Sequence, residues 1–365
     1  MIQIALISNF LSIHQKSLCD AFLSLDNVSF KFVSCFGPSG LKKSLSFNEN
    51  DNYVIRIYES IDQYNVAKCF IDSCDFIIFG SGDKKIIKDY KGTIFFYSEH
   101  FSKDFLFPLR AIHVHFLYKK YKNSYLLCAS SFAKKDYKYA KLFENRCLYF
   151  GYFPYPTINK EKHVFNDNNR KYLWCGRDVD FKRLSLAFFS AKCLYKNNCN
   201  FELTIVTQNG FSLNKLIKKN RKKPWYKHIL IINYLQNDEI RKKMFESDYF
   251  LLTSNKGEGW GAVLNEAMDE GCCCISSEKA GSTNYLIKNG SNGFVFKNKR
   301  SFEKVLKQTN NLSIEDLENI SINARYTIEK TWNAKKAASN LIASFKAINN
   351  LANIQTKEEP GYFIL

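Results

Sequence analysis

Short apolar runs recur along the whole chain, separated by longer segments of mixed composition. In the first half they lie at Ile2–Ser8, Val28–Cys35, Tyr53–Ile57, Phe76–Phe79, Thr93–Tyr97 and Tyr125–Ala129. Buried parallel strands give such continuous runs, and helical segments connect them, as near Lys16–Leu25. The pattern therefore predicts an α/β chain with a doubly wound parallel sheet.

The same rhythm starts again after Pro154–Asn169, where two prolines and a polar stretch predict a linker. The later strands are expected at Lys171–Cys175, Glu202–Val206, Ile229–Ile232, Tyr249–Thr253, Cys272–Ser276 and Gly293–Phe296. Helices are expected at Leu184–Leu194, Asp238–Glu246, Gly261–Asp269 and Ala334–Ile348. We predict two Rossmann-like domains, residues 1–160 and 161–333. A C-terminal helix and tail, residues 334–365, should pack back toward the first domain.

Composition narrows the class of protein. A chain of 365 residues is long for one core, and 45% hydrophobic residues argue against disorder. The formal net charge of +18 favours an anionic partner: nucleic acid, an anionic membrane or a phosphorylated small molecule. Twelve irregularly spaced cysteines and the lack of a 20-residue apolar run predict a cytoplasmic protein with reduced thiols.

The segment Ser254–Met268 is the most informative part of the sequence. Glu258 and Glu266 flank Gly259 and Gly261, between a strand end and a helix start. Such a loop turns backbone amides toward a ligand, and a helix N-terminus favours phosphate. Eight helical residues rise about 12 Å, so the two carboxylates would bracket an extended ligand. The alternative is a helix-capping Glu258 and an exposed Glu266.

A second cluster follows the first strand of the second domain. Arg177 and Lys182 stand five residues apart on a βα loop, where both can point at a ligand above the strand ends. Arg offers a fork to phosphate oxygens and Lys a point charge. The alternative is a solvated charged turn. Asp178 and Asp180 form a DxD pair, which we interpret as incidental rather than as a metal site.

Together these motifs resemble those of a family-4 glycosyltransferase, over roughly Lys171–Lys297. The resemblance rests on Gly176-Arg177…Lys182, on Glu258 and Glu266 around Gly-Trp-Gly, and on the later Asn289-Gly-Ser-Asn-Gly-Phe. It implies the GT-B fold, with two Rossmann-like domains facing across a cleft. It also implies a retaining, metal-independent transfer of a sugar from a UDP- or GDP-linked donor, with no cofactor.

The resemblance also assigns roles to residues. Arg177 and Lys182 would hold the diphosphate, Glu258 the donor sugar and Glu266 the ribose. The sugar and phosphates would be surrounded by Gly259, Trp260, Gly261 and Ala262. The nucleobase would rest near Thr207–Gly210 and Asn233–Leu235, which include Tyr234 and Leu235.

The first domain resembles a subset of capsule- and exopolysaccharide-type transferases. The matching motifs are Asn9…His14-Gln15, Tyr97-Ser98-Glu99, Cys128-Ala129-Ser130 and Gly151-Tyr152-Phe153-Pro154. The candidates for acceptor or donor-sugar contact are His14, Glu99 and His100, with a polar loop residue as the alternative for His100. His113 and His115 alternate on an expected strand or loop, without a third metal ligand.

Two segments concentrate the positive charge. Tyr118–Arg146 has eight Lys or Arg against two acids, interleaved with aromatic residues, and Lys215–Lys227 has seven and no acid. These are solvated faces, or the first meets an anionic membrane that carries a lipid-linked acceptor. Nucleic acid is the weakest alternative, because no recognised module is present.

The function that this sequence favours is sugar transfer to a glycan or lipid-linked oligosaccharide acceptor in surface polysaccharide synthesis. The enzyme would lie in the cytoplasm, or peripherally on the inner face of the membrane. The competing hypotheses are another GT-B enzyme, such as a sugar-nucleotide epimerase or a phosphorylase, and a nucleic-acid-binding protein.

Overall fold

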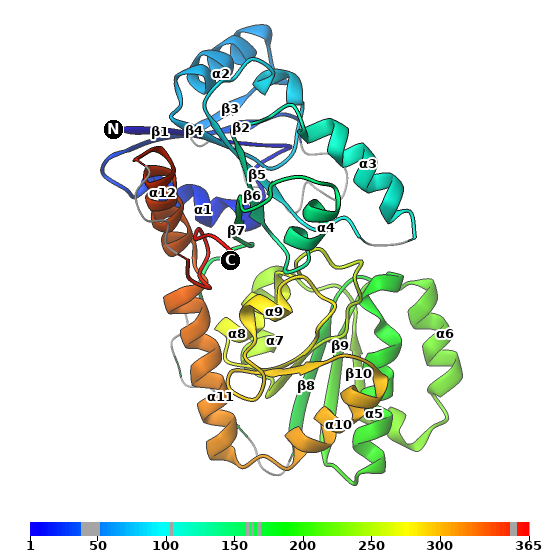
Figure 1. Cartoon of the computed structure of the whole chain (residues 1–365). Helices are drawn as coiled ribbons and strands as arrows, with labels where there is room; N and C mark the ends of the chain where they lie inside the picture. The colour runs from blue at the N-terminus through cyan, green and yellow to red at the C-terminus, as the bar shows by residue number, and fades with distance from the viewer. Residues whose placement is uncertain are drawn as a thin grey trace. The chain divides into compact units, whose positions relative to one another are not determined.

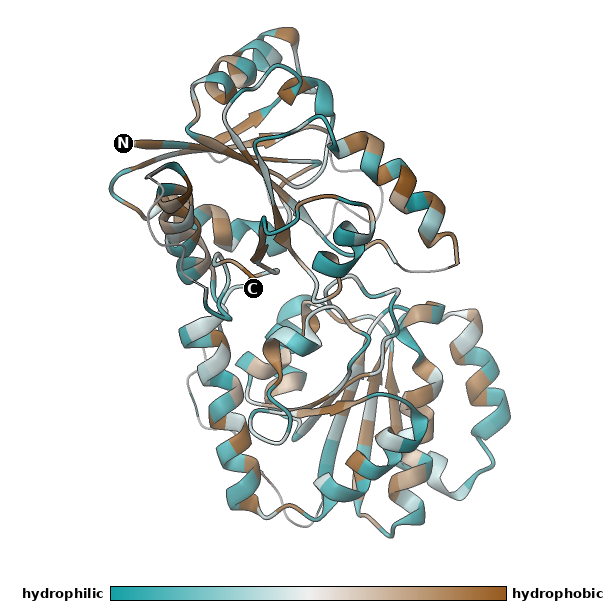
Figure 2. Ribbon diagram, in the orientation of Figure 1, coloured by the Kyte–Doolittle hydropathy of each residue, from teal (hydrophilic) through white to brown (hydrophobic). Residues whose placement is uncertain are grey.

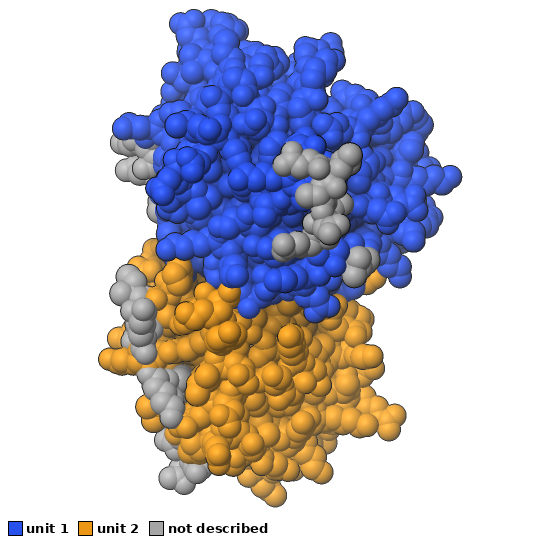
Figure 3. Space-filling view, turned by 60° about the vertical axis from the view of Figure 1, so that its left-hand side comes forward, with its two compact units in different colours: residues 1–155, 331–365 blue, residues 156–330 orange. Residues whose placement is uncertain are grey.

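The computed structural model describes residues 1–37, 52–102, 105–157, 161, 164–165, 169–350 and 356–364. The chain forms two compact units (Figure 3). The first comprises residues 1–155 and 331–365, and the second comprises residues 156–330. Much of the predicted linker Pro154–Asn169 lies outside the described residues, namely 158–160, 162–163 and 166–168.

The first unit is built on a seven-stranded sheet whose neighbouring strands all pair in parallel (Figure 1). In spatial order the strands are β3 (Val54–Arg56), β2 (Val28–Ser34), β1 (Ile2–Ser8), β4 (Phe76–Phe79), β5 (Thr93–Ser98), β6 (Ser124–Cys128) and β7 (Cys147–Tyr149). The helices are α1 (Ile13–Leu23), α2 (Ile61–Ser73), α3 (Phe107–Tyr118), α4 (Ala133–Tyr139) and α12 (Ala334–Asn350), with a 3₁₀ turn η2 (Lys84–Ile87).

Both faces of this sheet are covered, which explains the continuous apolar runs. Alternate side chains such as Ala5 and Ile7 join one core with residues of α2, α3 and α4. On the opposite face Phe76 packs against Phe345 of α12, at a ring-centroid distance of 4.7 Å. The described C-terminal tail also joins this unit, since Phe363 forms an antiparallel bridge with Leu148 of β7.

The second unit contains a six-stranded sheet, again with parallel pairing throughout. In spatial order the strands are β10 (Ile229–Ile232), β9 (Phe201–Val206), β8 (Arg170–Cys175), β11 (Tyr249–Leu252), β12 (Cys273–Ser277) and β13 (Phe294–Phe296). The helices are α5 (Leu184–Lys196), α6 (Phe211–Asn220), α7 (Asn237–Phe245), α8 (Val263–Asp269), α9 (Thr283–Leu286), α10 (Lys299–Asn310) and α11 (Ile314–Tyr326). Short turns are η3 (Asp180–Lys182), η4 (Pro224–His228) and η5 (Thr327–Thr331).

Each sheet has one point where the strand order reverses. In the first unit the chain runs outward from β1 to β3 and returns beside β1 as β4. In the second it runs from β8 to β10 and returns beside β8 as β11. Ligands of open α/β sheets bind outside the carboxyl ends of the strands at such switch points. Ligand sites are therefore expected at the loops that follow β1 and β4, and at those that follow β8 and β11.

The predicted α/β class and doubly wound sheets are confirmed. Hydrophobic residues concentrate on the strands of both units (Figure 2). The prediction of a strand or loop at His113 and His115 is wrong, because both lie in α3. The helix expected at Gly261 begins at Val263, since Gly261 has a left-handed φ of +93°. Among the described residues no helix is long and apolar enough to cross a membrane.

Candidate functional site

The turn η3, after β8, presents Lys182. Its backbone is fixed from β11 and the residues that follow, because Thr253 Oγ1 donates to Lys182 O at 2.7 Å and Asn255 N donates to Phe181 O at 2.8 Å. A Cβ atom on Gly176 would lie 3.4 Å from Lys182 Cδ, at van der Waals distance, so the lysine stem packs beside this residue. The loops of the two central strands thus hold this lysine in one place.

Lys182 meets Glu258 at the switch point of the second sheet. Lys182 Nζ lies 2.5 Å from Glu258 Oε2, and the two side chains are only 11% and 12% exposed. Ser254 Oγ donates to the same carboxylate oxygen at 2.9 Å. Glu258 therefore does not cap a helix. It lies in the loop before α8 and forms a largely buried ion pair with the predicted phosphate-binding lysine.

The glycine-rich segment between Glu258 and α8 is a tight loop. The Trp260 indole is buried and donates from Nε1 to Asn265 Oδ1 at 2.8 Å, so it belongs to the packed interior. Gly259 and Gly261 flank it, and Ala262 occupies the N-cap position of α8. Because α8 has only seven residues, the backbone of this loop, rather than a helix dipole, is the feature that can serve an anion.

Glu266 is buried on α8, contrary to the alternative of an exposed helical acid. Its Oε1 accepts a hydrogen bond from Asn237 Nδ2 at 3.2 Å. Burial raises the pKa of Glu266, and the charge of Arg241 and the Asn237 hydrogen bond oppose that shift. Asn237 follows the loop after β10 that carries Tyr234, which is exposed, and Leu235, which is partly buried. The predicted nucleobase loop is therefore tied to Glu266.

Cys175, the last residue of β8, lies close enough to Lys182, Glu258 and Glu266 for their charges to affect its thiol. Burial raises the pKa of its thiol to about 12, and the charges of Glu266, Lys182 and Glu258 all act on it. Three predicted residues therefore converge around one strand end. Arg177 lies on the same loop with an exposed side chain, so it is available to a ligand from solvent.

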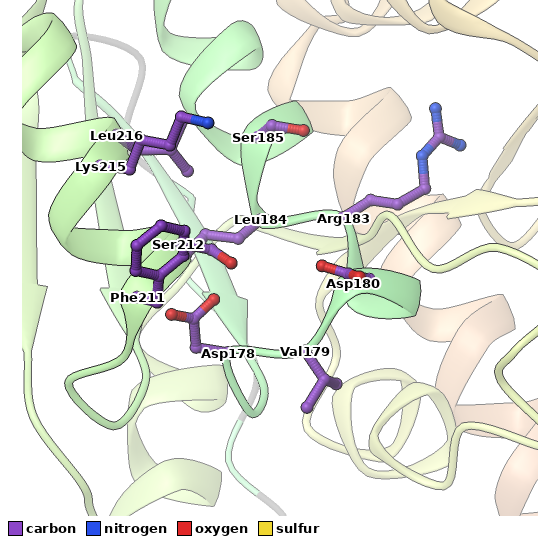
Figure 4. A pocket seen from close by; sticks show the side chains of 10 residues that line it. All are labelled: Asp178, Val179, Asp180, Arg183, Leu184, Ser185, Phe211, Ser212, Lys215 and Leu216. Atoms are coloured by element: carbon purple, nitrogen blue, oxygen red, sulfur yellow. The ribbon is translucent and has the colours of Figure 1, made fainter.

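Asp178 of the DxD pair holds the start of α6. Asp178 Oδ2 accepts a hydrogen bond from Leu213 N at 2.9 Å in the first turn of α6. Figure 4 shows Asp178 beside this turn, in a pocket of about 320 Å³ that also contains Asp180 and Arg183. Within the described parts of the chain, no group of three or more His, Cys, Asp or Glu is arranged to hold a metal ion.

Sequence reasoning missed three residues that organise this site: Ser254, Asn237 and Arg241. Asn237 and Arg241 act on partners far away in sequence, and Ser254, although it begins the segment Ser254–Met268, was given no role there. Arg241, for example, pairs with Asp269 Oδ2 at 2.5 Å and with Glu270 Oε1 at 2.6 Å. It thereby anchors α7 beside α8, the helix that carries Glu266.

We expect Arg241→Ala to lower the free energy of unfolding by about 3–5 kcal/mol, because it leaves two buried carboxylates without their cation. The measurement is urea unfolding of the purified variant. Lys243→Ala is the matched control, since it removes an exposed pair with Glu246 from the same helix and should cost under about 0.5 kcal/mol. Equal effects of the two substitutions would contradict the role of Arg241.

A second pocket, of about 300 Å³, lies at the switch point of the first sheet. It is lined by Ser8 at the end of β1, Gly80 and Ser81 after β4, Tyr97–Phe101, and also Gln15, Ala129 and Tyr152. The structure therefore brings the predicted Glu99 and His100 together. Glu99 Oε1 accepts a hydrogen bond from Tyr152 Oη at 3.1 Å, and the buried His100 Nδ1 lies 2.8 Å from Ser130 Oγ.

His14 borders this pocket through Tyr152, with ring centroids 5.8 Å apart. Burial lowers the pKa of His14 from 6.5 to about 4. Between these values the unfolded chain binds more protons than the folded one. The stability that neutral His14 permits at pH 7 is therefore lost as the pH falls from about 6.5 through 4.

Between pH 6.5 and pH 4 we expect the wild type to lose about 2 kcal/mol of its free energy of unfolding through His14, and His14→Gln not to show this loss. The loss is smaller than the full pKa shift implies because water reaches part of the ring. The measurement is the free energy of unfolding of wild type minus variant at pH 4–7. The variant His113→Gln, which replaces an exposed histidine outside this pocket, is the control for the loss of a histidine side chain. A flat difference for His14→Gln would contradict the assignment.

The structure resembles several solved structures along nearly its whole length. TarM matches over 94% of this chain and 99% of its own, with a TM-score of 0.70 and 11% identity. HepE from Anabaena, solved in complex with UDP-glucose, matches over 94% and 100%, with a TM-score of 0.62 and 15% identity. The lipopolysaccharide outer core galactosyltransferase WaaB matches over 96% and 98%, with a TM-score of 0.61 and 18% identity.

These likenesses define the GT-B class of fold, as the sequence predicted. A family model matches the sequence of the second unit. Residues 157–327 match the family model described as "Glycosyl transferases group 1". The sequence of the second unit is therefore similar to that of the group 1 glycosyltransferases. No curated protein matches the sequence.

Proposed function

We propose that this protein is a retaining, metal-independent glycosyltransferase that uses a nucleotide-diphosphate sugar. The observation that carries the proposal is the meeting of Lys182 and Glu258 at the carboxyl ends of β8 and β11, with Glu266 nearby. These three groups match the three parts of such a donor. The cation suits the diphosphate, the carboxylate of the ion pair suits the sugar, and the second buried carboxylate suits the ribose.

In this proposal the bound donor breaks the ion pair, so that Lys182 and Glu258 each take a partner on the donor. Lys182 turns from Glu258 to the phosphate oxygens, and the exposed Arg177 approaches them from solvent. The freed Glu258 then accepts hydrogen bonds from the sugar hydroxyls, and Glu266 from the ribose. Tyr234 and Leu235 border the nucleobase. The UDP-glucose bound to HepE supports this class of donor for a related fold.

For the reaction we propose front-face attack. The acceptor oxygen bonds to the anomeric carbon on the side from which the phosphate leaves, and the acceptor proton passes to a leaving phosphate oxygen. Lys182 and Arg177 stabilise the diphosphate as its negative charge increases. These two cations would supply the charge that a divalent metal provides in other transferases. Activity should therefore persist in excess EDTA.

The acceptor is proposed to be a glycan or a lipid-linked oligosaccharide of surface polysaccharide synthesis, such as a capsule. The pocket around Glu99 and His100 offers hydroxyl, carboxylate and aromatic groups suited to a sugar ring. WaaB and TarM lend support as enzymes of the same fold, and WaaB acts on lipopolysaccharide by its name. We place the enzyme in the cytoplasm at the inner face of the membrane.

Thermal stabilisation tests the donor assignment. The protein is melted with UDP, GDP, their sugars or an oligonucleotide, each with EDTA. One nucleoside diphosphate and its sugars should stabilise the protein by about 2.7 kcal/mol at 100 times the dissociation constant. Stabilisation by the oligonucleotide alone would refute the proposal. A donor that binds and is epimerised, or cleaved by phosphate, would reassign the same site to another reaction.

A further inference from the structure

Helix α3 carries apolar side chains on the face that points away from its own core. Leu109, Ile112 and Phe116 are 65%, 57% and 61% exposed, and Phe105 just before the helix is 88% exposed. Within α3, the spacing of three and four residues places Leu109, Ile112 and Phe116 on one side of the helix. In Figure 1 the helix lies at the outer edge of the first unit, and Figure 2 shows hydrophobic residues along it.

The opposite face of α3 is firmly packed. Ala111 is buried, and Val114 and Tyr118 pack against the core of the first unit. The ring centroids of Phe107 and Tyr139 of α4 lie 4.7 Å apart, and His115 Nδ1 lies 2.9 Å from Ala140 O. The helix is thus held in place by one apolar face while it presents a second one to solvent. Packing within the first unit explains the inner face only.

Positive charge lies at the C-terminal end of the exposed face. Lys119, Lys120 and Lys122 follow the C-terminus of α3, all exposed, and Lys119 Nζ lies 4.2 Å from the Phe116 ring centroid. The adjacent α4 region adds further exposed lysines: Lys135, Lys138 and Lys141. Lysines that extend along apolar surface while keeping the ammonium group in water are suited to a membrane interface.

We propose that the α3 face, defined as Phe105, Leu109, Ile112 and Phe116 with Lys119, Lys120 and Lys122, docks on an anionic lipid surface. The apolar side chains enter the interface, and the lysines contact lipid phosphates. This inference deepens the proposed function by assigning the membrane contact to named residues, but it does not rest on the donor chemistry.

A second copy of the chain is the less suitable occupant. Four side chains offer far less than the roughly 800 Å² per partner of a stable interface. Tyr118–Arg146 also carries eight basic residues against two acids, so two copies meeting here would bring like charges together. An anionic bilayer satisfies both halves of the surface, since it accepts apolar side chains and attracts the lysines.

Vesicle sedimentation tests the proposal with the full chain. The triple variant Leu109→Gln/Ile112→Gln/Phe116→Gln should lose at least about tenfold in partition to vesicles of phosphatidylglycerol and phosphatidylcholine (about 3:7). The control Ile61→Gln/Val66→Gln alters exposed apolar residues on α2, 72% and 54% exposed, and should bind like wild type. Nucleotide-induced thermal shifts of all variants should equal those of wild type, which separates this test from the donor assignment.

The variant Lys119→Gln/Lys120→Gln/Lys122→Gln tests the charge. Each lysine near an anionic surface contributes about fivefold in affinity, and the loss should vanish on pure phosphatidylcholine. The proposal would be overturned if the wild type did not bind anionic vesicles, or if the triple α3 variant bound them as the wild type does. So would light scattering that shows a wild-type dimer which the α3 variant converts to monomer, since the face would then join two copies.

Discussion

Lys182→Ala should reduce turnover by about 10²–10³-fold while the protein stays folded. The lysine is proposed to stabilise the departing diphosphate, and removal of one preorganised charge-stabilising donor typically has an effect of this size. The measurement is the kcat for transfer from the nucleotide sugar that the panel identifies. Far-ultraviolet circular dichroism and urea unfolding report on the fold.

Lys182→Ala also leaves Glu258 largely buried with Ser254 as its remaining side-chain partner among the described residues, so the stability should fall by about 2 kcal/mol. The double variant Lys182→Ala/Glu258→Gln should recover most of that stability and none of the activity. Lys304→Ala, an exposed lysine on α10, is the matched control and should behave like wild type. A folded Lys182→Ala protein with near-normal turnover would contradict the proposed role of Lys182 in stabilising the diphosphate.

Glu258→Gln should move two measurements in opposite directions. Its amide pairs less strongly with Lys182 and is a weaker acceptor for sugar hydroxyls, so kcat/KM for transfer should fall by about 10²-fold. The nucleoside diphosphate without a sugar should bind more tightly than to wild type, because Lys182 no longer has to leave a carboxylate. Isothermal titration and initial rates measure the two quantities.

The opposite signs distinguish a role in catalysis from a role in folding. If Glu258 only maintains the loop, Glu258→Gln should weaken diphosphate binding together with turnover. Ser254→Ala gives an intermediate control, since it removes one hydrogen bond to Glu258 and keeps the ion pair with Lys182. A parallel loss of both measurements in Glu258→Gln would contradict the partner exchange proposed here.

The buried strands were predictable because both faces of each sheet are covered. Continuous runs such as Ile2–Ser8 and Phe76–Phe79 are strands, and Ile229–Ile232 has the predicted bounds. Helix α3 was not recognised because it is apolar on its inner and outer faces alike. Without a polar face there is no helical period, and His113 and His115 appeared to alternate as on a strand.

The site was predictable where local spacing determines it. The glycine-rich loop between β11 and α8 indicated Glu258 and Glu266, and the βα loop after β8 indicated Lys182. The contacts among them were not predictable, because they depend on strand order: β8 and β11 are adjacent although about 75 residues separate them in sequence. Asn237 reaches Glu266 from another helix for the same reason.

The most direct test of the central claim is proton NMR of the product made from the nucleotide sugar that the panel selects, with mass spectrometry to confirm transfer to a lipid-linked acceptor. The account predicts a glycosidic bond with the anomeric configuration of the donor, formed in the presence of EDTA and lost in Lys182→Ala. A product of inverted configuration, or no transfer from any UDP- or GDP-linked sugar, would contradict it.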